Sequence, residues 1–157
     1  MEMQNNDALK AINSLLETCK DGEKGFKTAA ESVDNPQLKA ELNRFAQQRA
    51  NFRNELESCA RQLGGSAENE TSVAGLAMDA AGAVHRGWIN LKSAITGHDN
   101  KAILSECENG DAAALKTYET VMSSSTIPMN VKSVLQKQHD EIEAAKAAVS
   151  SLKNTIM

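Results

Sequence analysis

The sequence predicts an all-α protein that folds as a bundle of four long helices. Alanine is frequent, β-branched residues are few, and no stretch alternates apolar and polar residues with the two-residue period of a strand. Four segments instead carry apolar or small residues at alternating steps of three and four, which is the spacing of one helix face. With 157 residues, 41% of them hydrophobic, the chain 1–157 is predicted to be a single domain around one core.

The first half of the chain is predicted to be a helical hairpin of residues 6–33 and 36–63. Asn6 is a suitable cap for the first helix, and Asn35 with Pro36 supplies a cap and a first helical residue for the second. A pair of glycines follows the second helix and ends it. The apolar stripes of the two helices are Ile12, Leu15, Cys19, Gly22, Phe26, Ala29 and Val33, and Leu38, Leu42, Phe45, Arg49, Phe52, Leu56, Cys59 and Leu63.

The second half is predicted to hold helices over 71–96, 100–122 and 129–156. The helix over 71–96 begins with a stretch rich in alanine and glycine, and we interpret it as a crossover that lies close against its neighbours. Asp99 can cap the next helix, and the segment 123–128 separates it from the last one. The other two helices form a second hairpin, which is expected to pack against the first at about +20°.

Composition argues against several classes of function. Lysine and arginine number 17 against 21 aspartates and glutamates, the basic residues are scattered, and aromatic residues make up only 3%. Nucleic-acid binding is therefore not expected. The chain has no apolar run of membrane-spanning length and no signal-peptide pattern, so we expect a cytoplasmic protein that does not bind membranes. Its three cysteines are expected to be free thiols that act as small apolar residues, because no Cys-x-x-Cys motif is present.

Several segments resemble an uncharacterised bacterial ferritin-like family, a domain of unknown function. They are DGEKGF at 21–26, QRANF at 48–52, LGG at 63–65 and HRGWINLK at 85–92, the last being the most specific. The resemblance extends from about Asp7 to Leu152. It implies a ferritin-like bundle of two hairpins joined by a long crossover, and analogy with some ferritin-like proteins implies a role in a stress response.

A ferritin-like di-iron centre takes a carboxylate from each of two helices and a Glu-x-x-His pair from each of the other two. None of the three histidines here has a glutamate three residues before it. The matching positions are Arg49 with Phe52 in 36–63 and Glu143 with Lys146 in the last helix, and a protonated guanidinium or ammonium cannot bind a metal ion. The sequence therefore predicts that the di-iron ligand set is lost and that no metal or other cofactor is bound.

Two polar residues interrupt the apolar stripes and need partners inside the bundle. Arg49 lies in the middle of its stripe, and Gln138 interrupts the stripe of the last helix. The segments CKDGE at 19–23 and CENGD at 107–111 are similar, which places Glu23 and Asp111 at equivalent positions. We predict a buried polar network of Glu23, Arg49, Asp111 and Gln138. The alternative is that the Arg49 side chain extends to the surface and the carboxylates are solvated.

Two further groups of residues each have two interpretations. Arg86 and Trp88 are residue types that anchor protein interfaces, but Trp88 can equally hold the crossover against the bundle. His139, followed by Asp140 and by Glu143 one turn later, is either part of a surface acid-base or metal site or part of a partly solvated helix flank.

Three classes of function remain open, and none has an identified catalytic residue. The favoured one is a non-catalytic binding or structural protein with an unidentified protein partner, for which a homodimer is a common arrangement. The second is a metal-binding or peroxide-handling protein with an unusual ligand set drawn from Glu23, Asp111, Glu143 and the cysteines. The third is a protein that binds a small molecule in the interior of its bundle.

Overall fold

The computed structural model describes residues 2–64, 88, 91–97 and 99–155, with side chains from residue 7 onward except at residue 93. Over these ranges every regular element is a helix, so the predicted all-α class is confirmed for them. None of these helices is long and apolar enough to cross a membrane. The helices are α1 (Glu2–Ser32), α2 (Pro36–Gln62), α4 (Leu91–Thr96), α5 (Asn100–Met122) and α6 (Met129–Thr155).

The helix ends agree closely with the expected ones, with one exception. The side chain of Asn35 caps α2 by accepting hydrogen bonds from the backbone nitrogens of Gln37 at 2.7 Å and Leu38 at 3.2 Å. Asp99 caps α5 in the same way, accepting from the nitrogen of Lys101 at 3.0 Å. Asn6 was expected to be a cap but lies inside α1, because the residues before it continue the helix.

The helix predicted over 71–96 falls mostly outside the described residues. Its last part is present as α4, and Trp88 is also placed. The segments 65–87 and 89–90, and with them Arg86, lie outside the described part of the chain.

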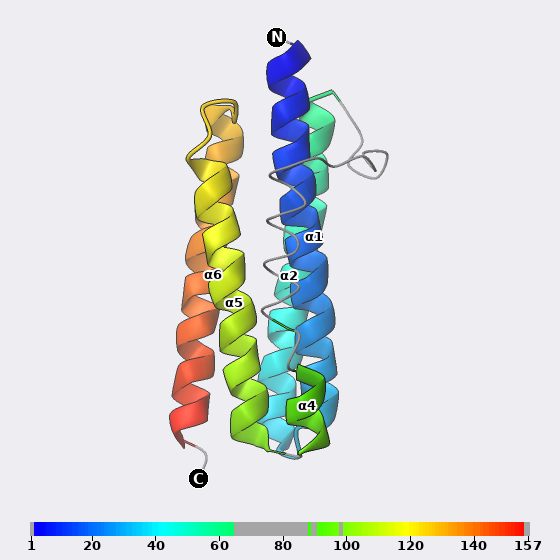
Figure 1. Ribbon diagram of the computed structural model, residues 1–157, viewed down its shortest axis with the longest axis vertical. Coiled ribbons are helices and arrows are strands. Elements are labelled where there is room, and N and C mark those ends of the chain that lie inside the picture. The colour runs from blue at the N-terminus through cyan, green and yellow to red at the C-terminus, as the bar shows by residue number, and fades with distance from the viewer. Residues whose placement is uncertain (1, 65–87, 89–90, 98, 156–157) are drawn as a thin grey trace.

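The four long helices lie side by side as two hairpins, α1 with α2 and α5 with α6 (Figure 1). α1 also packs against α5, and α2 packs against α6, while the short α4 sits beside α5 and α1. α2 and α5 therefore face each other across the diagonal of the bundle and run in the same direction (Figure 1). A side chain that points inward from α2 meets α5 across the centre rather than along a shared seam.

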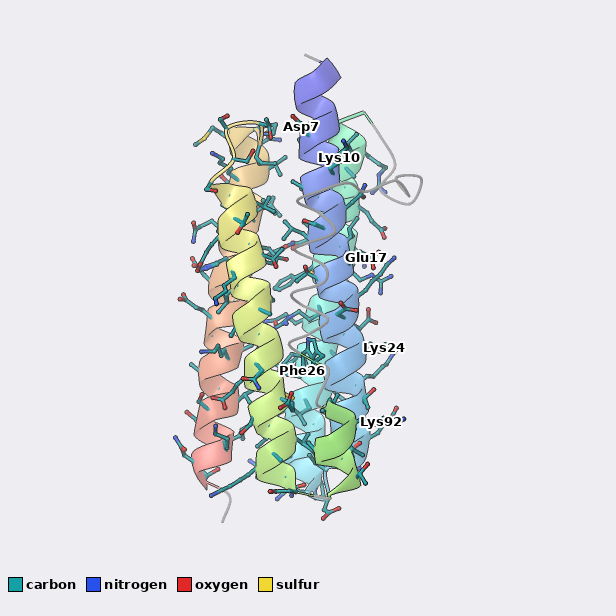
Figure 2. The ribbon with its side chains drawn as sticks, in the orientation of Figure 1. Asp7, Lys10, Glu17, Lys24, Phe26 and Lys92 are labelled. Atoms are coloured by element: carbon teal, nitrogen blue, oxygen red, sulfur yellow. The ribbon has the colours of Figure 1, made fainter. Side chains whose placement is uncertain are left out.

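The buried apolar residues form two clusters, one toward each end of the bundle. The first joins the early part of α1 to the ends of α2 and α5 and the start of α6, and the second joins the late part of α1 to the starts of α2 and α5 and the end of α6. Phe26 of the second cluster points inward, whereas Lys10, Glu17 and Lys24 follow the outer side of α1 (Figure 2). Along α2 and α5, polar residues separate the two clusters.

Trp88 is a packing residue between α1 and α5. Only 9% of it is exposed, and its ring meets that of Phe26 edge to face at 5.2 Å. A Cβ atom added at Gly25 or Gly110 would lie 2.5 Å or 2.1 Å from the indole ring, so these glycines make room for it. Trp88 thus has the packing role of its two interpretations, and as a buried residue it offers little surface to a partner.

Candidate functional site

A buried ion pair crosses the centre of the bundle. Arg49 of α2 donates a hydrogen bond from Nη1 to Oδ1 of Asp111 on α5, at 2.7 Å. Arg49 is 2% exposed and Asp111 is fully buried, so the arginine does not extend to the surface. Its Nε donates to Oε1 of Gln48 at 3.1 Å. Because α2 and α5 lie on the diagonal, only a long side chain such as arginine bridges them.

α1 provides the surface along which the arginine side chain runs. A Cβ atom at Gly22 would lie 3.2 Å from Nη1 and 3.3 Å from Cγ of Arg49, so the absence of a side chain lets the two approach closely. The guanidinium carbon lies 5.1 Å from the centre of the Phe26 ring, within the range of a cation–π contact. Both contacts help to fix the guanidinium at the centre.

The charges of this pair depend on each other. Burial lowers the pKa of Arg49, but the Asp111 carboxylate more than offsets this and raises it above its usual value. Burial raises the pKa of Asp111, and the guanidinium offsets part of that rise. The carboxylate has a permanent positive charge beside it, so a divalent cation placed there would be repelled by Arg49.

A second chain of hydrogen bonds, buried except at Glu55, connects all four long helices. Tyr118 of α5 donates from Oη to Oε1 of Gln138 on α6, at 2.7 Å. Gln138 donates from Nε2 to Oε1 of Glu55 on α2, at 2.8 Å. The Sγ atom of Cys19 on α1 lies 3.3 Å from Tyr118 Oη. Because the tyrosine proton goes to Gln138, the thiol is the donor in that contact.

Neither the thiol nor the phenol of this chain is set up to ionise. Burial raises the pKa of Cys19 to about 11, although the contact with Tyr118 and the nearby arginines lower it somewhat. Burial also raises the pKa of Tyr118 well above its usual value. Cys59 and Cys107 are buried and free, and burial raises the pKa of each thiol. The three thiols are packed among the buried side chains of the bundle, as small side chains of this type usually are.

The structure divides the predicted four-residue network. Arg49 and Asp111 are in direct contact, but Gln138 belongs to the separate chain through Tyr118. Glu23 accepts a hydrogen bond from Arg53 and is partly exposed. The similarity of 19–23 to 107–111 does not give the two segments equivalent surroundings, because α1 and α5 present them to different neighbours. Gly22 faces Arg49, whereas Gly110 faces Trp88.

Sequence reasoning missed Tyr118, Glu55 and the contact of Cys19. A signal for Tyr118 was present in its spacing, because it follows Ala114, a buried residue of α5, by four positions and so shares its face. A buried tyrosine needs a hydrogen-bond partner, and Gln138 needs one as well. Pairing these two unsatisfied residues would have found the contact.

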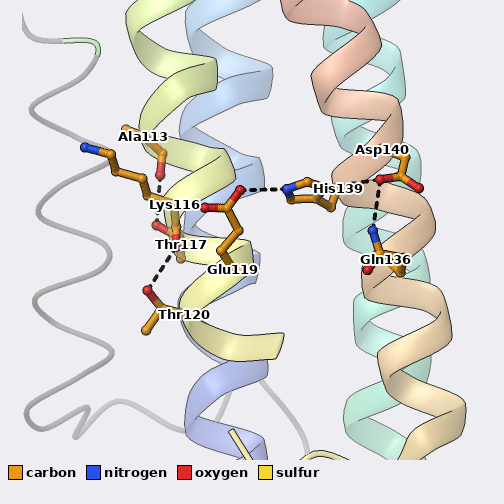
Figure 3. A network of polar contacts seen from close by, with 8 residues as sticks. All are labelled: Ala113, Lys116, Thr117, Glu119, Thr120, Gln136, His139 and Asp140. Carbon is orange, nitrogen blue, oxygen red and sulfur yellow. Dashed lines mark hydrogen bonds and ion pairs between the residues drawn. The ribbon is translucent and has the colours of Figure 1, made fainter. Parts of the chain in front are cut away.

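A polar cluster on the α5–α6 seam surrounds His139 (Figure 3). Its Nε2 lies 3.0 Å from Oε2 of Glu119 on α5, and its Nδ1 lies 3.2 Å from Oδ1 of Asp140. Gln136 donates to the same oxygen of Asp140 at 2.9 Å (Figure 3). His139 itself is only 8% exposed, while its partners Glu119 and Asp140 are exposed, so the ring lies at the inner edge of a partly solvated seam. Together with Asp140 and Glu143 it offers ligand atoms that all lie within 4.8 Å of one another.

A pocket of about 500 Å³ opens beside Trp88, between α1 and α4. Trp88, Leu91 and Ile95 give it an apolar floor, and Lys24, Lys92 and Asp21 also line it. Both lysines lie on the outer side of their helices (Figure 2). Two lysines against one aspartate give the lining a net positive charge, so the pocket suits a ligand with an apolar part and a negative charge.

Comparison with known proteins identifies the family of this chain. A search of curated proteins gives no match. The family model described as "Domain of unknown function (DUF2383)" matches residues 7–124, which is more than half of the chain and covers most of α1 and all of α2, α4 and α5. The chain therefore belongs to the DUF2383 family.

Proposed function

We propose that this protein is a ferritin-like bundle whose di-iron site is replaced by the Arg49–Asp111 ion pair, and that it acts as a non-catalytic binding or structural protein. The observation that carries the proposal is the guanidinium at the centre of the bundle. Ferritin-like di-iron proteins gather carboxylates and histidines from four facing helices at the corresponding place.

The residues that point into the middle of the bundle do not suit two metal ions. Asp111 is a single carboxylate and is already paired with Arg49. Gln138, Tyr118 and Cys19 are neutral and bonded to one another in a row. To take up a dication, the bundle would have to break the ion pair and keep the guanidinium buried without a partner, which costs about 3–5 kcal/mol.

Because no metal ion is expected at the centre of the bundle, we assign the binding activity of the protein to its surface. The chain has a net charge of −4, which favours a protein partner, or a second copy of the chain, over nucleic acid. A cytoplasmic location belongs to the same proposal.

Metal analysis tests the proposal. The protein is purified without chelator, incubated in air with ferrous iron, freed of unbound metal and analysed by plasma mass spectrometry. A His139→Ala variant is treated in the same way, so that iron bound by the histidine of the α5–α6 seam does not add to the iron measured per chain. Iron at background in this variant is the expected result. About two irons per chain in the variant would show a di-iron centre in the bundle and overturn the proposal.

A second candidate function is favoured by the pocket beside Trp88. Its apolar floor and two lysines fit a small anionic amphiphile, such as a fatty acid. This would make the protein a small-molecule binder, with the ligand held at the edge of the bundle rather than in its interior.

Tryptophan fluorescence tests this candidate because Trp88 is the only tryptophan in the chain. Titration with decanoate is expected to change the emission in a saturable way, and a Lys24→Gln/Lys92→Gln variant is expected to bind at least tenfold more weakly. Decanol, which lacks the charge, is the matched control ligand. An unchanged emission, or equal binding of decanoate and decanol, would rule the candidate out.

A further inference from the structure

The cluster around His139 has a feature that a simple surface salt bridge lacks. Both ring nitrogens face a carboxylate oxygen, Nε2 toward Glu119 and Nδ1 toward Asp140. A neutral imidazole has one N–H to donate. With that proton on Nε2 and given to Glu119, the Nδ1 lone pair and the Asp140 oxygen are two acceptors that face each other at 3.2 Å. A positive charge between them is needed, either a second proton or a metal ion.

The spacing of the cluster suits a metal ion. His139 and Glu143 are four residues apart on α6, which places them one above the other on the same face, and Asp140 lies beside them. Their ligand atoms lie within 4.8 Å of one another. Ligands about 2.0–2.1 Å from a tetrahedral zinc ion are about 3.3 Å apart, close to the distance between Nδ1 and the Asp140 oxygen.

Glu119 supplies the support that metal-binding histidines usually have. A histidine ligand commonly donates its other N–H to a carboxylate, which fixes the orientation of the ring and leaves the lone pair on the metal side. Here the carboxylate comes from α5, the neighbouring helix (Figure 3). The ring is also buried by its surroundings, so its orientation is fixed before any ion arrives.

We propose that His139 Nδ1, Asp140 and Glu143 bind one divalent transition-metal ion such as Zn²⁺, with Glu119 as a positioning residue. Imidazole selects for zinc, cobalt, nickel or copper over magnesium and calcium. Asp140 and Glu143 are exposed, so water completes the coordination and the ion exchanges with solvent. The site is separate from the buried centre, and its three ligands lie beyond residues 7–124 that the family model matches, whereas Glu119 lies within them.

Zinc titration by calorimetry tests the proposal on the full chain, after treatment with EDTA and desalting. The wild type is expected to bind one zinc ion per chain near neutral pH. Glu143→Gln is expected to weaken binding at least tenfold. Glu141→Gln, which neutralises another carboxylate of the same helix outside the cluster, is expected to bind like the wild type. No binding by the wild type at millimolar zinc, or equal affinity in Glu143→Gln, would overturn the proposal.

The role of Glu119 has a test of its own. Cobalt(II) replaces zinc and reports its coordination through visible absorption, which a change in helix stability alone would not alter. Glu119→Gln is expected to keep the fold, measured by circular dichroism, to weaken zinc binding about 10-fold or more, and to shift the cobalt spectrum. An unchanged affinity and spectrum would show that Glu119 does not position the ligand.

Discussion

The centre of the bundle and the α5–α6 seam both place an aspartate beside a nitrogen base, and they use it differently. In the centre Asp111 meets a guanidinium, which keeps its proton at any physiological pH. On the seam Asp140 meets an imidazole, which gains and loses a proton near neutral pH. The first pair is a fixed pair of charges, and the second can exchange a proton for another cation. The basic partner, more than the carboxylate, decides what the site can do.

The two regions also differ in how far water can compensate a change. Arg49 and Asp111 are almost completely removed from solvent, whereas Glu119 and Asp140 are exposed. Loss of one partner in the centre leaves a charge that nothing neutralises, while water takes over at the surface. We therefore expect substitutions in the centre to have larger effects on stability than substitutions on the seam.

The largest effect is expected for Arg49→Met. It leaves the Asp111 carboxylate buried without a counter-charge, so the free energy of unfolding should fall by about 3–5 kcal/mol. Urea unfolding followed by circular dichroism measures this. An Arg49→Met/Asp111→Leu variant removes both charges and should recover most of the loss. A loss below about 1 kcal/mol in the single variant would mean that the buried ion pair contributes no more to stability than an exposed one. The two regions would then not differ in their effect on stability.

Gly110→Ala should have the next largest effect. The new Cβ atom would lie 2.1 Å from Cε2 of Trp88, so the ring or α5 has to move. Overpacking of this kind costs about 1–3 kcal/mol, and it outweighs the gain in helix propensity. Urea unfolding and a red shift of the Trp88 emission report the change. Gly22→Ala is the milder comparison, since its Cβ would lie 3.2 Å from Nη1 of Arg49, a longer distance than the 2.1 Å at Gly110. Equal stability of the two variants would contradict the tight packing of Trp88.

Tyr118→Phe should lower the free energy of unfolding by about 1–2 kcal/mol, because Gln138 Oε1 loses its hydrogen bond inside the bundle. The same urea unfolding experiment measures the change. Thr120→Ala on the same helix removes an exposed hydroxyl that bonds only to the backbone of its own turn, and it should change stability little. A Tyr118→Phe variant as stable as the wild type would mean that the chain through all four helices adds nothing to stability.

The smallest effect is expected from the pH dependence of His139. Desolvation lowers its pKa, but hydrogen bonds to Glu119 and Asp140 raise it by more, so the folded value lies above the 6.5 of the free side chain. A raised folded pKa contributes stability that is complete below 6.5 and is lost as the pH rises through the folded value. Urea midpoints at about pH 6 and about pH 8 should therefore fall more in the wild type than in His139→Gln. Parallel changes in both proteins would contradict this contribution.

The sequence by itself determined the helices. Asn35, Pro36 and Asp99 mark where α2 and α5 begin, because their side chains or ring geometry end the preceding turn and satisfy the first free backbone nitrogens. Heptad spacing then showed which face of each helix is buried. The same spacing showed that Arg49 lies on the buried face and needs a partner, because a lone charge there is too unfavourable.

Only the tertiary structure decided which partner that is. Glu23 and Asp111 follow similar motifs, yet Asp111 faces the centre and Glu23 turns to Arg53 near the surface. Periodicity within a helix fixes the angle of each side chain around its own axis, but it does not fix how two helices are rotated and shifted relative to each other. Contacts across the diagonal of the bundle depend on that relation, so the pairing of Arg49 with Asp111 and of Tyr118 with Gln138 emerged only when the four helices packed together.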